Sequence, residues 1–576
     1  MPKREKQSFL HGALILSAAA ILTKIIGALF FKIPLQNINQ TAYGYFDAAY
    51  NIYIPLYTVS TAGFPVAVSR LVSESLALGR FRDIRVIHRV ANRIFFVTGM
   101  IGTVIMFIAG FLYPNFVNMP PVMLTMLVMA PSILFCCMVS AYRGVYEGSR
   151  NMYPTAISQI LEAVGKLAVG LGLAAGALHL GQWQYEHGGV VFGQPAADAA
   201  QALEISLPYI AAGGMVGVTF GSFISLAYLM LRYRIKGNGI TRAEMAASPR
   251  PYSSKRIFRR LLTFAIPVAL GTLATQLTNL IDVVSLQKCL AVVVERGGDV
   301  IRQMYASQIE ASGTTDILAY LTASRGIAMT YVNLVPNITL TLGISALPVI
   351  TSAWAMKNRA QLKKMVSVVL RITLLVALPS GIGLSLLATP ILNLIYDPVT
   401  ASVAGPQLQV LGIAVVFICL TAPINSMLQA MGRADIPAKI VLAGGLVKLV
   451  LNVILVMQPR LNIIGSAYST LACYIVMVLL SLIALRRVVG VRLNARMIFV
   501  RPLIASVICG AAAWAVNALL ALWIPAKVAV VAAILAAVAV YVVALFMTRA
   551  IAKEDVLMLP KGEKIAQILE KHNWIG

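Results

Sequence analysis

Residues 526–547 read AKVAVVAAILAAVAVYVVALFM, and the 20 residues that follow Lys527 in this stretch carry no charge. A helix needs about 20 consecutive apolar residues to cross the hydrocarbon core of a bilayer. This stretch alone therefore predicts a membrane-spanning helix. The whole chain has the same character: of its 576 residues 59% are hydrophobic and 12% are charged, whereas soluble proteins carry about 25% charged residues. We predict an all-α integral membrane protein.

Similar apolar windows recur along the chain and predict about 14 transmembrane helices. Six windows precede a basic loop at 232–260, six follow it, and two more lie near the C-terminus. In chain order the windows are 9–32, 45–70, 92–114, 120–142, 154–180, 204–231, 260–285, 322–354, 366–396, 406–430, 437–457, 463–485, 502–523 and 526–547.

The basic residues lie mostly on one side of this arrangement. With the N-terminus in the cytoplasm, 37 of the 47 Lys and Arg residues fall in cytoplasmic clusters, and this asymmetry orients membrane proteins during insertion. The even number of spans then predicts a cytoplasmic C-terminus in a multi-pass cell-membrane protein. The net charge of +26 indicates contact with anionic lipid headgroups rather than nucleic acid, because it is dispersed over eight loops without a nucleic-acid-binding module.

Motifs for catalysis or cofactor binding are missing from the sequence. The five histidines have no metal-ligand spacing, no P-loop occurs, and five of the six cysteines lie in apolar windows. We therefore expect no enzyme activity, no cofactor, no metal and no disulfide framework. A membrane-bound glycosyltransferase or ligase is one alternative, but the longest outer segment, about 285–321, interleaves its acids with arginines, which is more typical of a solvated helix or cap.

An internal repeat divides the chain. GSRNMYPTAISQILEAVGKL (148–167) echoes GRADIPAKIVLAGGLVKL (432–449), and residues 62–90 echo 342–370. Both pairs have the same direction and sidedness, so helices 1–6 and 7–12 are interpreted as parallel repeats. The predicted organisation is an N-terminal lobe at 1–235, a cytoplasmic linker at 236–258, a C-terminal lobe at 259–487, two further helices at 488–548 and a cytoplasmic amphipathic tail at 549–576.

Several of these segments resemble a known family. TNLIDVVS (278–285), LGISALPVITSAW (342–354) and LRITLLVALPSGIGLSLLATPILNLIY (370–396) resemble the second lobe of MurJ-type lipid II flippases. AGFPVAVSRLVSES (62–75) and LPKGEKIAQILEK (559–571) are similar to the stage V sporulation protein B and YtgP branch of polysaccharide transporters. Both branches belong to the multidrug/oligosaccharidyl-lipid/polysaccharide exporter (MOP) superfamily. The resemblance implies two six-helix lobes around a central cavity, alternating access, and two extra helices that form a lipid-facing groove.

Charged residues inside the predicted spans are candidates for the transport site, because they are costly in a bilayer. Lys24, Lys166 and Lys448 lie deep in their windows, and a structural ion pair or polar contact between helices is the alternative for all three. Glu162 precedes Lys166 by four residues, so these two side chains can partly neutralise one another. Arg325 and Lys32 are further candidate cations near the outer mouth.

Polar residues also share helix faces. Asp47 and Asn51 are spaced i, i+4, as are Asn333 and Asn337, while Gln276, Asn279 and Asp282 are spaced i, i+3, i+6. These residues could line a vestibule for sugar hydroxyls or a coupling cation, or they could join helices by hydrogen bonds. Tyr45, Tyr50, Tyr53 and Tyr57 could contact sugar or act as interfacial anchors.

The chain departs from the MurJ-type pattern in one respect. Where that family has an Arg-Asp pair in helix 1, this sequence has Phe30 and Phe31, and Tyr331 lies near the family's helix-8 arginine. Only Lys24 carries over as a cationic position, so we expect it to contribute more to transport than Lys166 or Lys448.

The favoured function is that of a flippase for an undecaprenyl-diphosphate-linked saccharide, either lipid II or a polysaccharide precursor. We expect a monomer that is driven by membrane potential, H⁺ or Na⁺. The alternative within the same superfamily is a cation-coupled multidrug exporter.

Overall fold

The structure is a computed structural model of the chain. It describes residues between 15 and 555, except for 17, 20–21, 62–63, 150, 238–239, 313–315, 337–338, 340–349, 351–352, 355, 434, 491–493 and 553–554. The predicted position Asn337 and almost all of the predicted amphipathic tail lie outside the described residues.

The described chain is almost entirely helical, which confirms the predicted fold class. Ten of its helices are long and apolar enough to cross a membrane. These ten match ten of the 14 predicted windows. The other four windows, at 9–32, 45–70, 260–285 and 322–354, each include residues whose backbone or side chains are not described.

The chain divides into two compact units, and the first comprises residues 1–291 and 313–323. The elements that begin in unit 1 are η1 (Ile26–Lys32), α2 (Ile33–Ile38), α3 (Gln40–Thr61), α4 (Phe64–Ala77), α5 (Phe81–Phe116), α6 (Val122–Gly148), α7 (Tyr153–Gly188), β1 (Val190–Val191), β2 (Gln194–Pro195), α8 (Ala199–Lys236), α9 (Arg242–Ala247), α10 (Ser254–Arg296) and α13 (Ile317–Val332).

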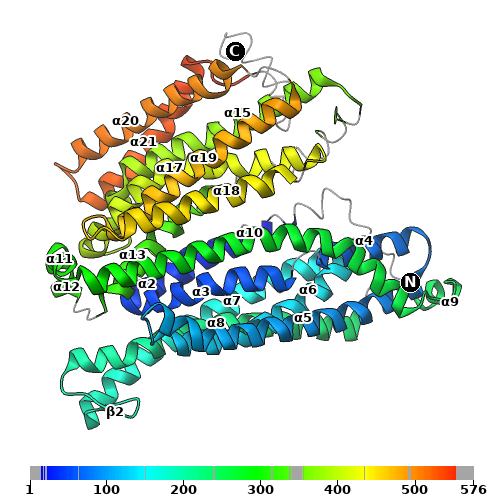
Figure 1. Cartoon of the computed structure of the whole chain (residues 1–576), viewed down its shortest axis with the longest axis horizontal. Helices are drawn as coiled ribbons and strands as arrows, with labels where there is room; N and C mark the ends of the chain where they lie inside the picture. Colours follow the sequence, from blue (N-terminus) through cyan, green and yellow to red (C-terminus); the bar gives the residue numbers. More distant parts are fainter. Residues whose placement is uncertain are drawn as a thin grey trace. The chain divides into compact units, whose positions relative to one another are not determined.

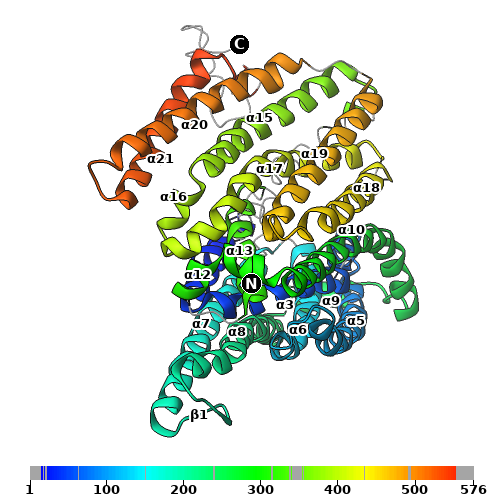
Figure 2. The same cartoon turned by 60° about the vertical axis from the view of Figure 1, so that its left-hand side comes forward.

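Helices α7 and α8 of unit 1 run side by side to a short hairpin (Figures 1 and 2). With 36 and 38 residues they are about 54 and 57 Å long at 1.5 Å per residue, which exceeds the bilayer core of about 30 Å. Strands β1 and β2 pair antiparallel at the tip. We call this tip the hairpin end of unit 1.

The close approach of α7 and α8 depends on glycine. A Cβ on Gly217 would press against the backbone of Gly170 and lie 2.6 Å from the carbonyl oxygen of Lys166. Small residues allow this kind of backbone contact between membrane helices, where van der Waals packing drives association. The glycines therefore hold the backbone of α8 directly against the turn of α7 that carries Lys166.

A segment from the second half of the sequence completes unit 1. The Tyr45 hydroxyl donates a 2.6 Å hydrogen bond to the Asp316 carboxylate, and Ala319 packs its carbonyl group against Gly44. Residues 316–323 therefore pack on α3, although more than 270 residues separate them in sequence.

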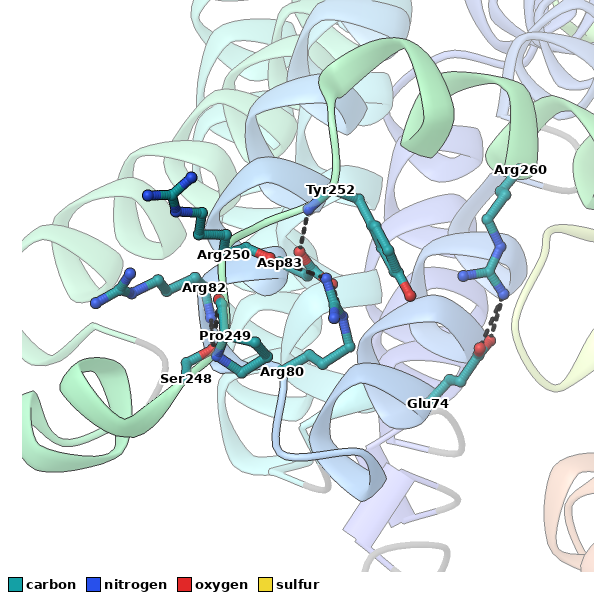
Figure 3. Close-up of polar contacts among 9 residues, drawn as sticks. All are labelled: Glu74, Arg80, Arg82, Asp83, Ser248, Pro249, Arg250, Tyr252 and Arg260. Carbon is teal, nitrogen blue, oxygen red and sulfur yellow. Dashed lines mark hydrogen bonds and ion pairs between the residues drawn. The ribbon is translucent and has the colours of Figure 1, made fainter.

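The segment between α8 and α10 is attached to the start of α5, as Figure 3 shows. The buried Asp83 carboxylate accepts hydrogen bonds from Arg80 Nε at 2.6 Å and from the Tyr252 backbone N–H at 2.8 Å. The Arg80 guanidinium lies 3.6 Å from the centre of the Tyr252 ring, and its hydrogen bond to Asp83 raises the pKa of Arg80. We call this end of unit 1 the basic end.

Two more contacts fasten the basic end. The Arg82 side chain donates to the carbonyl oxygen of Met245 in α9 at 3.0 Å. Arg260, in the first turns of α10, makes two 2.8 Å hydrogen bonds to the carboxylate of Glu74 in α4. The connecting segment is thus part of the packed unit rather than a free tether.

Unit 2 comprises residues 292–312 and 324–576. Its elements are α11 (Gly298–Met304), α12 (Ala306–Ser312), α15 (Arg359–Leu386), α16 (Ala388–Asn393), α17 (Pro398–Ala430), α18 (Asp435–Leu451), η2 (Asn452–Val456), α19 (Asn462–Val489), η3 (Arg496–Val500), α20 (Arg501–Leu520) and α21 (Ala526–Met547).

The main core of unit 2 is formed by apolar side chains of α15, α17 and α19, such as Leu370, Leu420 and Val478. Helices α20 and α21 pack beside α15, and the Tyr541 hydroxyl donates to the Leu375 carbonyl oxygen at 2.7 Å. A buried ion pair closes this arrangement after α21: Arg371 makes two hydrogen bonds, of 2.6 and 2.7 Å, to the Asp555 carboxylate.

Candidate functional site

An aromatic and acidic face of α3 forms one wall of the candidate site in unit 1. The rings of Tyr43, Phe46, Tyr50, Tyr53 and Tyr57 follow one another along the helix at centroid distances of 5.6–5.9 Å. Residues three or four positions apart lie on the same helix face, so this spacing produces a continuous aromatic ladder. Tyr45 and Tyr53 are buried, which does not fit the interfacial-anchor interpretation for these two residues.

Asp47 lies on the same helix and is buried. Its carboxylate accepts a 2.8 Å hydrogen bond from Asn51 Nδ2 and lies 3.9 Å from Lys32 Nζ. Asp47 and Asn51, which were predicted to share a helix face, are therefore in direct contact. Lys32 provides the opposite charge that a buried carboxylate requires.

Two lysines lie near the Tyr50 ring. Lys32 Nζ is 5.2 Å and Lys166 Nζ is 5.0 Å from its centroid, so the two ammonium groups are at most about 10 Å apart. Lys166 Nζ is also 4.5 Å from the Phe31 ring. Aromatic faces attract cations electrostatically. Two lysines and one aspartate leave this cluster with a formal charge of +1.

The Glu162 carboxylate accepts a 2.9 Å hydrogen bond from Arg143 Nη2. Its partial neutralisation of Lys166, four residues later on the same helix, stays a prediction. Arg143 also donates to Ser158 at 2.9 Å and to Ser225 at 3.3 Å. A guanidinium from the neighbouring helix α6 offers several donors at once, so Arg143 binds Glu162, Ser158 and Ser225 together.

Arg143 is the residue that sequence reasoning missed, because its position near Arg150 assigned it to a loop. In the structure it lies within α6, about a turn and a half before the helix ends at Gly148. The signal that could have found it is Glu162, an acid in an apolar window that requires a cation from an adjacent helix.

The remaining predicted residues of unit 1 are not part of this cluster. Lys24 is exposed and precedes η1, the π-helical segment that ends at Lys32. In α10, Asn279 Nδ2 donates to Gln276 Oε1 at 3.3 Å, and Asp282 is partly buried. Gln276 and Asn279, predicted to share a face of this helix, thus contact one another.

Three predicted residues belong to unit 2. Arg325 in α13 and Lys448 in α18 are partly buried, and Asn333 is exposed after the end of α13. The structure therefore brings together Lys32, Asp47, Asn51 and Lys166, and it leaves the unit 2 residues as separate candidates.

Unit 2 contains an apolar groove of about 450 Å³. It is lined mainly by α15, α20 and α21, with Leu384, Ile391, Ala513, Val538 and Tyr541 among the lining residues. Such a lining can accommodate a hydrocarbon chain, whereas the cluster around Tyr50 can hold an anion.

Comparisons with known proteins identify the class. The family model for polysaccharide biosynthesis proteins matches residues 9–192, and the MatE model matches residues 319–454. Stage V sporulation protein B of Bacillus subtilis is 23% identical over 556 residues, which covers 96% of this chain and 98% of that protein. Lipid II flippase MurJ of the same organism is 25% identical over 494 residues, with 84% and 83% coverage.

Solved structures show the same fold. Lipid II flippase MurJ in an inward closed conformation matches with a TM-score of 0.62 at 14% identity, covering 93% of this chain and 98% of that one. An inward-facing multidrug resistance MATE family transporter matches with a TM-score of 0.58 at 13% identity, with 83% and 98% coverage.

These features define a multi-pass membrane transporter rather than an enzyme. Residues 9–192 match the polysaccharide biosynthesis protein family of the MOP superfamily, and the chain is a distant homologue of stage V sporulation protein B and MurJ.

Proposed function

We propose that the chain is a flippase that moves an undecaprenyl-diphosphate-linked saccharide from the inner to the outer leaflet of the cell membrane. The observation that carries this proposal is the pair of ammonium groups, Lys32 and Lys166, which lie 5.2 and 5.0 Å from the centre of the Tyr50 ring in unit 1. A diphosphate is an anion that two lysines can bind by charge-assisted hydrogen bonds. The name of one relative, lipid II flippase MurJ, supports a lipid-linked substrate.

The other parts of the molecule suit the same substrate. The apolar groove of unit 2, about 450 Å³ in volume, has a lining that suits a hydrocarbon chain such as a polyprenyl tail. Asp47 and Asn51 would accept and donate hydrogen bonds to sugar hydroxyls or bind a coupling ion. The vestibule would also include Lys24, Arg325, Lys448, Gln276, Asn279, Asp282, Asn333 and Asn337, with Glu162 held by Arg143.

The full proposal includes about 14 spans, two parallel six-helix lobes around a central cavity, and both termini in the cytoplasm. The basic end of unit 1 would then face the cytoplasm and the hairpin end the outside. Labelling of single cysteines placed in the 232–260 loop tests this: a membrane-impermeant reagent should not reach them in intact cells. We expect a peptidoglycan or cell-wall precursor as the substrate.

The test is flipping of a labelled lipid-linked saccharide in proteoliposomes. Lys166→Gln and Lys32→Gln each remove one charge-assisted hydrogen bond to phosphate, worth about 1.5–3 kcal/mol, so the rate should fall roughly 10- to 150-fold. Lys439→Gln is the matched control, because that lysine is 79% exposed. Wild-type rates in both correctly folded variants would refute the anion site. In cells, depletion of the protein should cause the lipid-linked intermediate to accumulate on the inner leaflet.

A cation-coupled multidrug exporter is the second candidate. The match of residues 319–454 to the MatE model and the buried Asp47 carboxylate favour it. Transport measurements distinguish the two functions. An exporter would extrude cationic dyes, and Asp47→Asn would abolish this extrusion. It would leave the lipid-linked saccharide in the inner leaflet.

A further inference from the structure

The hairpin end of unit 1 contains a pocket of about 640 Å³, away from the lysine cluster. Its walls are the connection between α5 and α6, the first turns of α8, and the β1–β2 hairpin. The residues that matter for its chemistry are Pro121, Leu124, Gln194, Gln201, Glu204 and Tyr209. Small-molecule sites in proteins typically enclose about 300–1,000 Å³, so the pocket has the size of a ligand site.

The hairpin is built so that Gln194 forms part of this wall. The Phe192 ring stacks on Tyr209 at 4.0 Å with an interplanar angle of 12°, and the Phe192 N–H donates to Gln184 Oε1 at 2.9 Å. Gly193 has a φ of +84°, which glycine adopts without strain and which closes the turn before Gln194. The hairpin is thus fixed to both α7 and α8, and Tyr209 belongs to the stack and to the pocket.

The acidic residues of the hairpin end favour a neutral ligand over an anion. Between Lys166 and Arg232 the sequence has no Lys or Arg, but it has Glu186, Asp198 and Glu204. The pocket therefore offers a carboxylate, amides and a phenol beside proline and leucine surfaces. Glu204 repels phosphate, whereas neutral hydroxyl groups can bind the carboxylate and amides.

The pocket is separated from the lysine cluster within the same unit. Glu204 and Gly217 are 13 positions apart on α8, or about 20 Å at 1.5 Å per residue, and Gly217 packs on the turn that carries Lys166. A neutral ligand in the pocket therefore does not compete with an anion bound between Lys32 and Lys166.

We propose that this pocket is a binding site for a neutral saccharide. Gln194, Gln201 and Glu204 would hydrogen-bond its hydroxyl groups, while Pro121, Leu124 and Tyr209 would contact its apolar ring face. The pocket's role in transport rests on the proposed function: it would hold the saccharide headgroup on the outer side after the diphosphate has crossed.

The test is direct binding to the full chain in lipid nanodiscs, measured by saturation-transfer NMR and calorimetry. The probes are diacetylchitobiose, cellobiose and maltose, with inorganic phosphate as the anionic comparison. We expect at least one disaccharide to bind with a millimolar Kd that phosphate does not change. Leu124→Trp, which fills the pocket, should raise this Kd at least tenfold, and Glu204→Gln should raise it several-fold. Glu186→Gln, on an exposed part of α7 outside the pocket, should leave it unchanged.

Several results would overturn the site: none of the disaccharides binds, phosphate displaces them, or Leu124→Trp binds as the wild type does. The outcome is independent of the flippase proposal because no transport is measured. If a disaccharide binds in the pocket but the protein does not flip the lipid-linked saccharide, the flippase proposal is refuted and the saccharide site stands. If flipping occurs and depends on Lys166 but no disaccharide binds, only the saccharide site is refuted.

Discussion

The ion pair between Arg371 and Asp555 gives a quantitative test of how unit 2 is held together. Both side chains are only 6% exposed, and two hydrogen bonds of 2.6 and 2.7 Å join them. The Asp555 carboxylate also accepts from the Ala552 N–H at 2.9 Å. The pair fastens the chain just after α21 to α15, and both helices line the apolar groove.

Removal of one partner leaves a charge buried without its counter-ion, which costs about 3–5 kcal/mol. Asp555→Asn and Arg371→Met should each lower the free energy of unfolding by this amount. At about 2–4 °C per kcal/mol for domains of similar size, the midpoint of thermal unfolding should fall by roughly 6–20 °C. The double variant, Arg371→Met with Asp555→Leu, should recover most of the loss, because a well-packed apolar pair often matches a buried ion pair.

A thiol-reactive fluorescent dye provides the assay, because all six cysteines are buried and become reactive only on unfolding. Asp435→Asn is the control: its partner Arg433 is 51% exposed, and exposed pairs contribute at most about 1 kcal/mol. The reasoning fails if the single variants unfold at the wild-type midpoint, or if the double variant is no more stable than either single one.

Three further changes test other parts of the molecule. Lys24→Ala should reduce flipping while Lys24→Arg partly preserves it; a correctly inserted Lys24→Ala with the wild-type rate would show that Lys24 is no anion anchor. Gly217→Ala should destabilise the α7–α8 contact by about 1–3 kcal/mol through overpacking, measured by the thiol assay. Gly172→Ala is the control and should leave the unfolding midpoint unchanged, because a Cβ at Gly172 would meet nothing within 4 Å. Asp83→Asn should weaken the attachment of Tyr252 by about 1–3 kcal/mol, so trypsin should cleave the connecting segment after Arg242 at least several-fold faster; unchanged cleavage would refute the role of Asp83.

Sequence periodicity was sufficient for the fold class and for contacts within one helix. Asp47 and Asn51 were expected on one face and are hydrogen-bonded. Ten helices coincide with predicted windows because an apolar run of this length has few alternatives in a bilayer.

Contacts between distant segments could not be predicted in the same way. Glu162 binds Arg143 on another helix, and Arg371 binds Asp555, which follows it by 184 residues in the sequence. The pattern of one helix shows which residues share a face, but the partner on the neighbouring helix depends on packing between segments that are remote in sequence. For the same reason, sequence periodicity did not indicate that Lys32 and Lys166 both lie near Tyr50.

The hydrogen bond between Tyr45 and Asp316 has a consequence for biogenesis. The ribosome makes α3 some 270 residues before the segment that packs on it. Until residues 316–323 have entered the membrane, Gly44 lacks its neighbour Ala319, and the face of α3 around it is open to lipid or to an insertion chaperone. A fragment that ends at residue 235 would keep this face uncovered permanently, because it lacks residues 316–323. Maturation of the first unit must therefore wait for part of the second half of the chain.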